Sequence, residues 1–103
     1  MLEEEKDAAL DIARRTGIPY ASFENRILTM DTDGELAKAI PEKIARARRV
    51  LPLFRDGKVL AVAMVDPSET LLKELETIAG SPIQPFITTK TQLARALDES
   101  YPQ

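Results

Sequence analysis

Hydrophobic residues recur at helical spacing near the start of the chain. The apolar positions that share one face are Leu2, Ala9, Ile12 and Ala13. Acidic residues crowd the beginning of this segment and basic residues its end, as the helix dipole favours. Gly17 then stops the helix, and Pro19 prevents its continuation. The pattern predicts a helix over residues 2–16.

The next segment has a less regular pattern. Residues 18–23 are typical of an extended stretch, with Tyr20 and Phe23 as apolar anchors. The apolar residues between positions 27 and 30 fit either a short strand or an irregular loop. Both alternatives stay open from the sequence.

Turn-forming residues follow at positions 31–34 and supply an N-cap for a short helix over residues 35–40. The same turn resembles the start of a calcium loop, but it lacks the third acidic ligand and the distal glutamate, so no metal site is predicted. Pro41 ends the first short helix and fits the first turn of a second one over residues 42–48.

Two apolar runs, residues 50–54 and 59–65, predict a β-hairpin. Between them stands Asp56-Gly57, a strong hairpin signal because both residues can take a positive φ. The second run is apolar on both faces and contains no proline, as expected of a central strand. Pro52 lacks an N–H group and therefore places the first strand at an edge.

A helix is predicted to begin directly after the hairpin. Asp66 suits the N-cap, Pro67 the first helical position and Glu69 the return arm of a capping box. Gly80 ends this helix. The residues expected to face the core are Leu71, Leu72, Leu75, Ile78 and Ala79.

The end of the chain completes an α+β fold. Residues 83–87 predict a third strand, which Pro85 places at the other edge, parallel to the second strand by a right-handed crossover. Thr89 and Gln92 predict a capping box for a last helix. That helix is lined by Leu93, Ala94, Leu97 and Tyr101. We expect residues 1–103 to form one domain: N-terminal helices followed by a three-stranded mixed sheet packed by helices.

Composition narrows the chemistry. The chain has no cysteine and no histidine, which excludes disulfides, thiolate nucleophiles, histidine-based triads and the common zinc sites. No glycine-rich phosphate motif and no suggestive carboxylate pair occurs. A net charge of −3 and an aromatic content of 5% argue against the binding of nucleic acid. The sequence therefore predicts a protein that is not an enzyme and has no cofactor.

Two features of the chain bear on its location. Its longest apolar run, residues 59–65, is much shorter than a membrane helix requires. The N-terminus is acidic where a secretory signal would be basic and then apolar. We therefore expect a cytoplasmic protein that does not span a membrane.

The basic residues near position 46 are the first candidates for a binding site. Arg46, Arg48 and Arg49 could meet phosphates or an acidic partner surface. The favoured alternative is a solvated helix face whose arginines pair with nearby glutamates. Asp66 is the second candidate, because it stands between a buried strand and a helix, but a role as N-cap accounts for it fully.

Several short motifs carry a resemblance through their order and spacing. They are residues 16–20 (TGIPY), 40–45 (IPEKIA), 49–53 (RVLPL), 56–60 (DGKVL), 62–67 (VAMVDP), 78–80 (IAG) and 83–85 (IQP). In this order they resemble the N-terminal domain of type II secretion and type IV pilus assembly ATPases. The resemblance covers nearly the whole chain, although residues 22–33 form a longer stretch than is usual there.

The resemblance implies a non-catalytic domain that precedes a hexameric motor and docks it onto a membrane-anchored partner protein. It also implies an alternative, since some members bind cyclic di-GMP through an RLGxxL-type motif. Here Arg15 and Gly17 match that motif, Thr16 stands where leucine is expected, and Tyr20 takes the next apolar position. The candidate contacts for a partner or ligand are Arg15, Gly17, Tyr20, Arg46, Arg48, Arg49 and Asp66.

The sequence leaves three hypotheses for the function. The preferred hypothesis is that the domain docks and regulates a motor, with the contacts to the partner in residues 20–30 or 46–49. Sensing of cyclic di-GMP would need arginines against phosphates and an aromatic ring against guanine. An unrelated enzyme would need a carboxylate or lysine with a shifted pKa in a cleft, and nothing in the sequence supports one.

Overall fold

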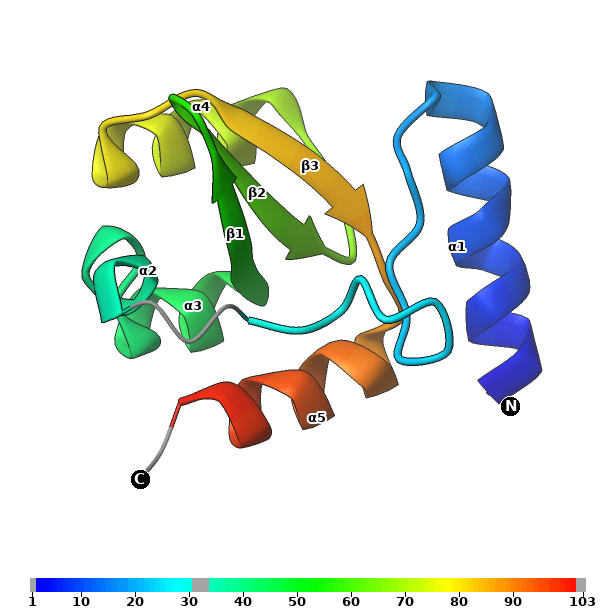
Figure 1. Cartoon of the computed structure of the whole chain (residues 1–103). Coiled ribbons are helices and arrows are strands. Elements are labelled where there is room, and N and C mark those ends of the chain that lie inside the picture. Colours follow the sequence, from blue (N-terminus) through cyan, green and yellow to red (C-terminus); the bar gives the residue numbers. More distant parts are fainter. Residues whose placement is uncertain (1, 31–33, 102–103) are drawn as a thin grey trace.

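A computed structural model describes residues 2–30 and 34–101 of the chain (Figure 1). Its elements are α1 (Leu2–Thr16), α2 (Gly34–Ala39), α3 (Glu42–Arg48), β1 (Val50–Asp56), β2 (Val59–Met64), α4 (Glu69–Ala79), β3 (Ile83–Ile87) and α5 (Lys90–Ser100). The predicted α+β class is confirmed, with helices first and a small mixed sheet after them. The turn at residues 31–33, predicted to cap α2, lies outside the described residues.

The sheet has the predicted topology. Its strand order is β1-β2-β3, with β1 antiparallel and β3 parallel to β2. Pro52 and Pro85 therefore lie on the two outer strands, as their missing N–H groups require. One addition was not predicted, since Tyr20 forms an isolated parallel bridge with Ile87 at the end of β3.

The hairpin differs in detail from the prediction. Asp56 is the last residue of β1 and pairs with Val59, so the two turn residues are Gly57 and Lys58. Gly57 alone of these two takes a positive φ, +63°. The register shifts at Leu53, which forms a bulge. Strand β1 also ends at Asp56, two residues further than predicted.

The predicted N-cap of α4 is wrong. The helix begins at Glu69 and its N-cap is Ser68, whose hydroxyl accepts a hydrogen bond of 3.1 Å from the Leu71 N–H. Asp66 is exposed and lies in a bend. The residues directly after β2 form a bend that leaves the sheet, so the helix starts later and is capped by Ser68, which the sequence analysis had not singled out.

The capping box of α5 is confirmed only in part. The Thr89 side chain accepts a hydrogen bond of 3.1 Å from the Gln92 N–H. The Gln92 side chain turns instead to residues 20–23: its Oε1 accepts from the Phe23 N–H and its Nε2 donates to the Tyr20 hydroxyl. Leu93 and Leu97 face the core as predicted, but Ala94 is exposed and Ala96 is buried in its place.

Residues 22–30 form an irregular loop rather than a strand. Ser22 and Asn25 hold it through reciprocal hydrogen bonds between the side chain of each and the N–H group of the other, at 2.9 and 3.1 Å. Leu28 anchors the loop in the hydrophobic core. Of the two alternatives left open by the sequence, the loop is therefore confirmed.

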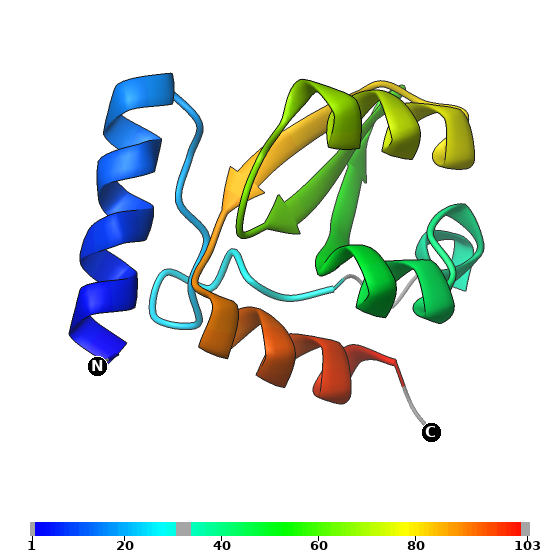
Figure 2. The ribbon, with the colours of Figure 1, turned by 180° about the vertical axis from the view of Figure 1, so that it is seen from behind.

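The helices surround the sheet unequally. Helices α2, α3 and α5 contact β1, whereas α4 and α1 contact β3. Figures 1 and 2 show α1 standing at one side of the molecule, across the sheet from α2 and α3. The core lies between the sheet and the other helices; its largest fully buried side chains include Leu36, Ile40, Leu51, Leu53, Leu60, Met64, Leu75 and Leu93.

Candidate functional site

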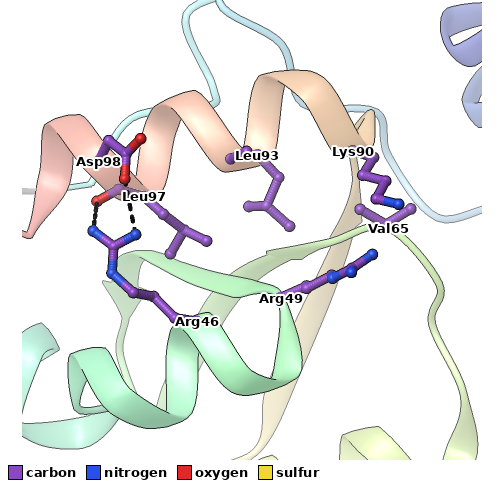
Figure 3. A pocket seen from close by; sticks show the side chains of 8 residues that line it. Arg46, Arg49, Val65, Lys90, Leu93, Leu97 and Asp98 are labelled. Atoms are coloured by element: carbon purple, nitrogen blue, oxygen red, sulfur yellow. Dashed lines mark hydrogen bonds and ion pairs between the residues drawn. The ribbon is translucent and has the colours of Figure 1, made fainter.

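A groove of about 350 Å³ lies between α3 and α5 (Figure 3). It is lined by Arg46, Arg49, Val65, Lys90, Leu93, Ala94, Leu97 and Asp98. In Figure 3 the Leu93 and Leu97 side chains lie between the two ends, Arg46 and Asp98 occupy one end, and Arg49 and Lys90 occupy the other. The groove thus has an apolar middle and charged ends.

Arg46 is neutralised within the chain. Its Nε lies 2.7 Å from the Glu42 Oε2, and its Nη1 lies 2.8 Å from the Asp98 Oδ1. A longer bond of 3.4 Å runs from its Nη2 to the Leu97 carbonyl oxygen. Hydrogen bonds to Asp98 and then to Glu42 raise the pKa of Arg46 above its ordinary value. This end of the groove is therefore a bridge between α3 and α5 with its charge balanced.

Arg49 has a different environment. It is the C-cap of α3 in a left-handed conformation, with φ 56° and ψ 57°, and its N–H donates to the Ala45 carbonyl. The side chain is exposed and forms no ion pair within the described part of the chain. Its guanidinium lies at the Val65 and Lys90 end of the groove (Figure 3).

Lys90 is the residue of this site that the sequence analysis missed. It is the first residue of α5, and, like Arg49, it has no ion pair among the residues that the structure describes. A cation at the beginning of a helix opposes the helix dipole. The position of Lys90 at the start of a predicted helix, directly after the N-cap Thr89, is the signal in the sequence that could have identified this residue.

The two ends of the groove are therefore electrostatically unlike. Two carboxylates balance Arg46, whereas Arg49 and Lys90 come together from different elements with no carboxylate of residues 2–30 and 34–101 within ion-pair distance. Other lysines and arginines of the described residues also form no ion pair, so Arg49 and Lys90 are distinguished by lining the same groove. An anionic group placed beside them would meet both charges.

The predicted basic face does not act as one surface. Arg46 turns to α5, and Arg48 turns to α4, where its Nε lies 2.8 Å from the Glu74 Oε1. Arg49 alone of the three lines the groove without such a partner. The prediction that the arginines pair with nearby acids therefore holds for Arg46 and Arg48 and does not hold for Arg49.

The remaining candidate residues lie apart from the groove. Arg15 is exposed and pairs with Asp11 at 3.0 Å along α1, and Gly17 ends that helix with φ +76°. Tyr20 is half-buried and receives the hydrogen bond from Gln92 described above. Asp66 is exposed at the bend after β2. None of these residues lines the groove.

A second polar contact, also missed from the sequence, attaches α1 to the rest of the molecule. The Glu5 carboxylate accepts hydrogen bonds from the Thr91 N–H at 3.1 Å and from the Thr91 hydroxyl at 2.7 Å. These bonds, the hydroxyl's foremost, lower the pKa of Glu5. A cavity of about 280 Å³ lies beside this contact, and the buried Thr88 Oγ1 in its wall has no hydrogen-bond partner among the described residues.

Metal binding and membrane insertion find no support in the described residues. No group of three or more histidine, cysteine, aspartate or glutamate side chains among residues 2–30 and 34–101 could hold a metal ion. No described helix has both the length and the apolar character needed to cross a membrane.

Comparison with known proteins identifies the family. The model of the MshEN domain matches residues 16–103. The chain belongs to the MshEN domain family. The match begins at the last residue of α1 and includes the whole sheet and both helices of the groove. The resemblance drawn from the ordered motifs is thereby confirmed.

Two curated relatives of this MshEN domain are type IV pilus assembly ATPases. It is 24% identical over 91 residues to the type IV pilus assembly ATPase PilB of Myxococcus xanthus, and 29% identical over 102 residues to PilB of Thermus thermophilus. These matches cover 87% and 96% of the chain. They cover only 15% and 11% of the two relatives, so the domain corresponds to a small part of each ATPase.

Solved structures show the same fold. The structure of MshE with cdg, cyclic di-GMP, has a TM-score of 0.73 and 26% identity, and the match covers 87% of this chain and 63% of that one. The N-terminal domain of XpsE has a TM-score of 0.80 at 15% identity, covering 95% and 67%. The second likeness shows the fold alone.

Proposed function

We propose that this MshEN domain is a non-catalytic docking and regulatory domain. In this proposal residues 1–103 act as one domain that links the motor of a type II secretion or type IV pilus ATPase to a membrane-anchored partner protein on the cytoplasmic side. The similarity to two PilB ATPases over a small part of their length supports a role beside a motor rather than as one.

The observation that carries the proposal is the groove between α3 and α5. It places two cations without carboxylate partners next to an apolar surface, on helices that pack against the sheet. That combination suits contact with another protein, because interfaces join an apolar centre to charged groups that orient the partner. The carboxylate that lines the groove, Asp98, is held in an ion pair with Arg46.

Binding to the partner is the direct test. The purified chain is titrated by calorimetry with the cytoplasmic domains of the membrane-anchored proteins of its own secretion or pilus machine. We expect one of them to bind with a dissociation constant on the order of 1–100 µM, as is common for transient contacts. If none of them binds, the docking function is wrong. Release of phosphate from ATP by the chain alone should stay at the level of buffer.

Sensing of cyclic di-GMP is the less favoured function. The structure of MshE with cdg is the reason to test it, and Arg15 and Gly17 are the residues that the motif would use. Here Arg15 is paired with Asp11, and neither residue lines a described pocket. Titration with cyclic di-GMP, followed through the amide signals of residues 15–20, distinguishes the two functions. Saturable shifts there would favour sensing.

A further inference from the structure

We propose that the end of the groove formed by Arg49 and Lys90 binds an acidic peptide segment of the partner protein. A carboxylate of that segment lies between the two cations, and a neighbouring apolar side chain packs against Val65 and Ala94, the apolar lining residues that are at least partly exposed. This inference rests on the proposed docking function and deepens it by assigning the chemistry of the partner.

The charge of the groove favours a carboxylate at one end only. The guanidinium of Arg46 already forms ion pairs with Glu42 and Asp98. Arg49 and Lys90 form no ion pair with a carboxylate of the described residues, although the charge of Lys90 acts at longer range on Glu5. A carboxylate brought to this end gains two charge-assisted contacts, whereas at the other end it would meet Asp98.

The apolar lining favours a ligand that carries an apolar group as well as an anion. The residues between the charged ends are Val65, Leu93, Ala94 and Leu97. Val65 is half-buried and Ala94 is exposed, so part of this surface is open to a ligand. A peptide segment can supply a carboxylate and an apolar side chain together, as inorganic phosphate cannot.

Two other anionic ligands fit the groove less well. A nucleotide base commonly stacks on an aromatic ring, and none of the residues that line the groove is aromatic. An anionic membrane surface recruits clusters of about four to eight basic residues. This end of the groove has two cations in a chain of net charge −3.

The chain itself offers a matched pair of variants for the test. Arg49 and Arg26 are both arginines with a left-handed backbone, at φ 56° and φ 63°, and both are exposed. Glycine adopts this conformation without steric cost, so Arg49→Gly and Arg26→Gly each remove one cation and keep the fold. Arg49 lines the groove and Arg26 does not. Lys90→Gln removes the second cation.

Binding is measured by amide NMR with a synthetic helical peptide of about 15 residues that carries glutamate and leucine on one face. We expect saturable shifts at Arg49, Val65, Lys90 and Ala94. Arg49→Gly should weaken binding about threefold, and Arg49→Gly with Lys90→Gln about tenfold, while Arg26→Gly leaves it unchanged. A peptide with lysine in place of glutamate should not bind, and raising the salt concentration should weaken the binding of the acidic peptide.

Further outcomes separate this inference from the function on which it rests. If the partner domain binds the wild-type chain and the Arg49→Gly/Lys90→Gln variant equally, docking stands and the groove is the wrong place. If no partner domain binds but the acidic peptide shifts the groove signals, the site stands and the docking function fails. Equal shifts with inorganic phosphate, cyclic di-GMP or anionic vesicles at the same residues would overturn the choice of a peptide.

Discussion

The Tyr101 hydroxyl donates a hydrogen bond of 2.7 Å to the Ile40 carbonyl oxygen, joining two positions 61 residues apart. Tyr101 directly follows α5, and Ile40 directly follows α2. Both residues are buried, with exposed fractions of 4% and 0%. Because α3 begins two residues after Ile40, this bond holds the end of α5 near the start of α3. It thereby helps set the separation of the two helices that form the groove.

Tyr101→Phe should lower the free energy of unfolding by about 1–2 kcal/mol. The substitution keeps the ring but removes the donor from a buried carbonyl. Urea unfolding followed by circular dichroism measures the change. Tyr20→Phe, which removes a half-buried hydroxyl from its bond with Gln92, is the matched control and should cost less. Equal stability of Tyr101→Phe and wild type would contradict this role.

Stability should also fall at alkaline pH because of the same residue. Burial raises the pKa of Tyr101 from 10.0 to about 12. The unfolded chain therefore loses this proton first, so the contribution of Tyr101 is complete below pH 10 and is lost as the pH rises towards 12. Urea unfolding between pH 8 and pH 11 should show a steeper decline for wild type than for Tyr101→Phe. Parallel curves would argue against the raised pKa.

Substitutions can test that Ser68, rather than Asp66, is the N-cap of α4. Ser68→Ala should destabilise the protein by about 1 kcal/mol, because it removes the acceptor for the Leu71 N–H. Asp66→Ala should change stability by less than about 0.5 kcal/mol, since Asp66 is exposed and caps no helix in this fold. Thermal unfolding of the two variants decides the matter. The reverse order would restore Asp66 as the N-cap.

Glu5→Gln should loosen α1 without unfolding the rest of the chain. It weakens both hydrogen bonds to Thr91 by removing the negative charge of the acceptor. Faster amide exchange in α1 and a shifted Thr91 amide signal are expected. Glu4→Gln, which changes an exposed acid one position earlier, is the control.

Acid should have the same effect on α1. The pKa of Glu5 is lowered in the folded chain, so its contribution is present above the ordinary value of 4.5 and is lost as the pH falls through the lowered one. The protection of the α1 amides, meaning their exchange rate compared with that of an unstructured chain at the same pH, should therefore fall in acid for wild type and change little for Glu5→Gln. An α1 that is equally protected in both proteins would show that the Thr91 contact does not hold it.

Arg49→Gly and Arg26→Gly should each stabilise the protein slightly, by about 0.5–1 kcal/mol. A left-handed backbone costs an L-residue about 1–2 kcal/mol, and glycine gives back part of the gain through its greater freedom in the unfolded chain. Thermal unfolding of the two variants measures the change. A loss of stability in either would mean that its side chain makes a contact worth more than the strain.

Local signals predicted most of the secondary structure correctly. Gly17 ended α1, Thr89 capped α5, and Pro52 and Pro85 marked the two edge strands. Each of these effects depends on a residue and its immediate neighbours along the chain, namely a positive φ, a capping hydroxyl or a missing N–H group. Before α4 the local pattern indicated Asp66 as the N-cap, whereas the structure uses Ser68.

The candidate site could be predicted only in part. The sequence indicated Arg46, Arg48 and Arg49 as basic residues of one segment, and it gave no sign that they would turn to different helices. Lys90 was missed because it lies far along the chain and joins Arg49 only when α5 packs beside α3.

The sequence by itself determined the order and type of the elements and the mixed sheet, because these follow from periodicity, short-range stereochemistry and the handedness of the crossover. The order of its short motifs carried the family resemblance. Tertiary structure alone decided the contacts between distant residues, such as Gln92 with Tyr20, Glu5 with Thr91 and Tyr101 with Ile40. It also decided which cations remain without a partner. The physical reason is that an ion pair or hydrogen bond depends on distances of a few ångströms, and packing of whole helices sets those distances.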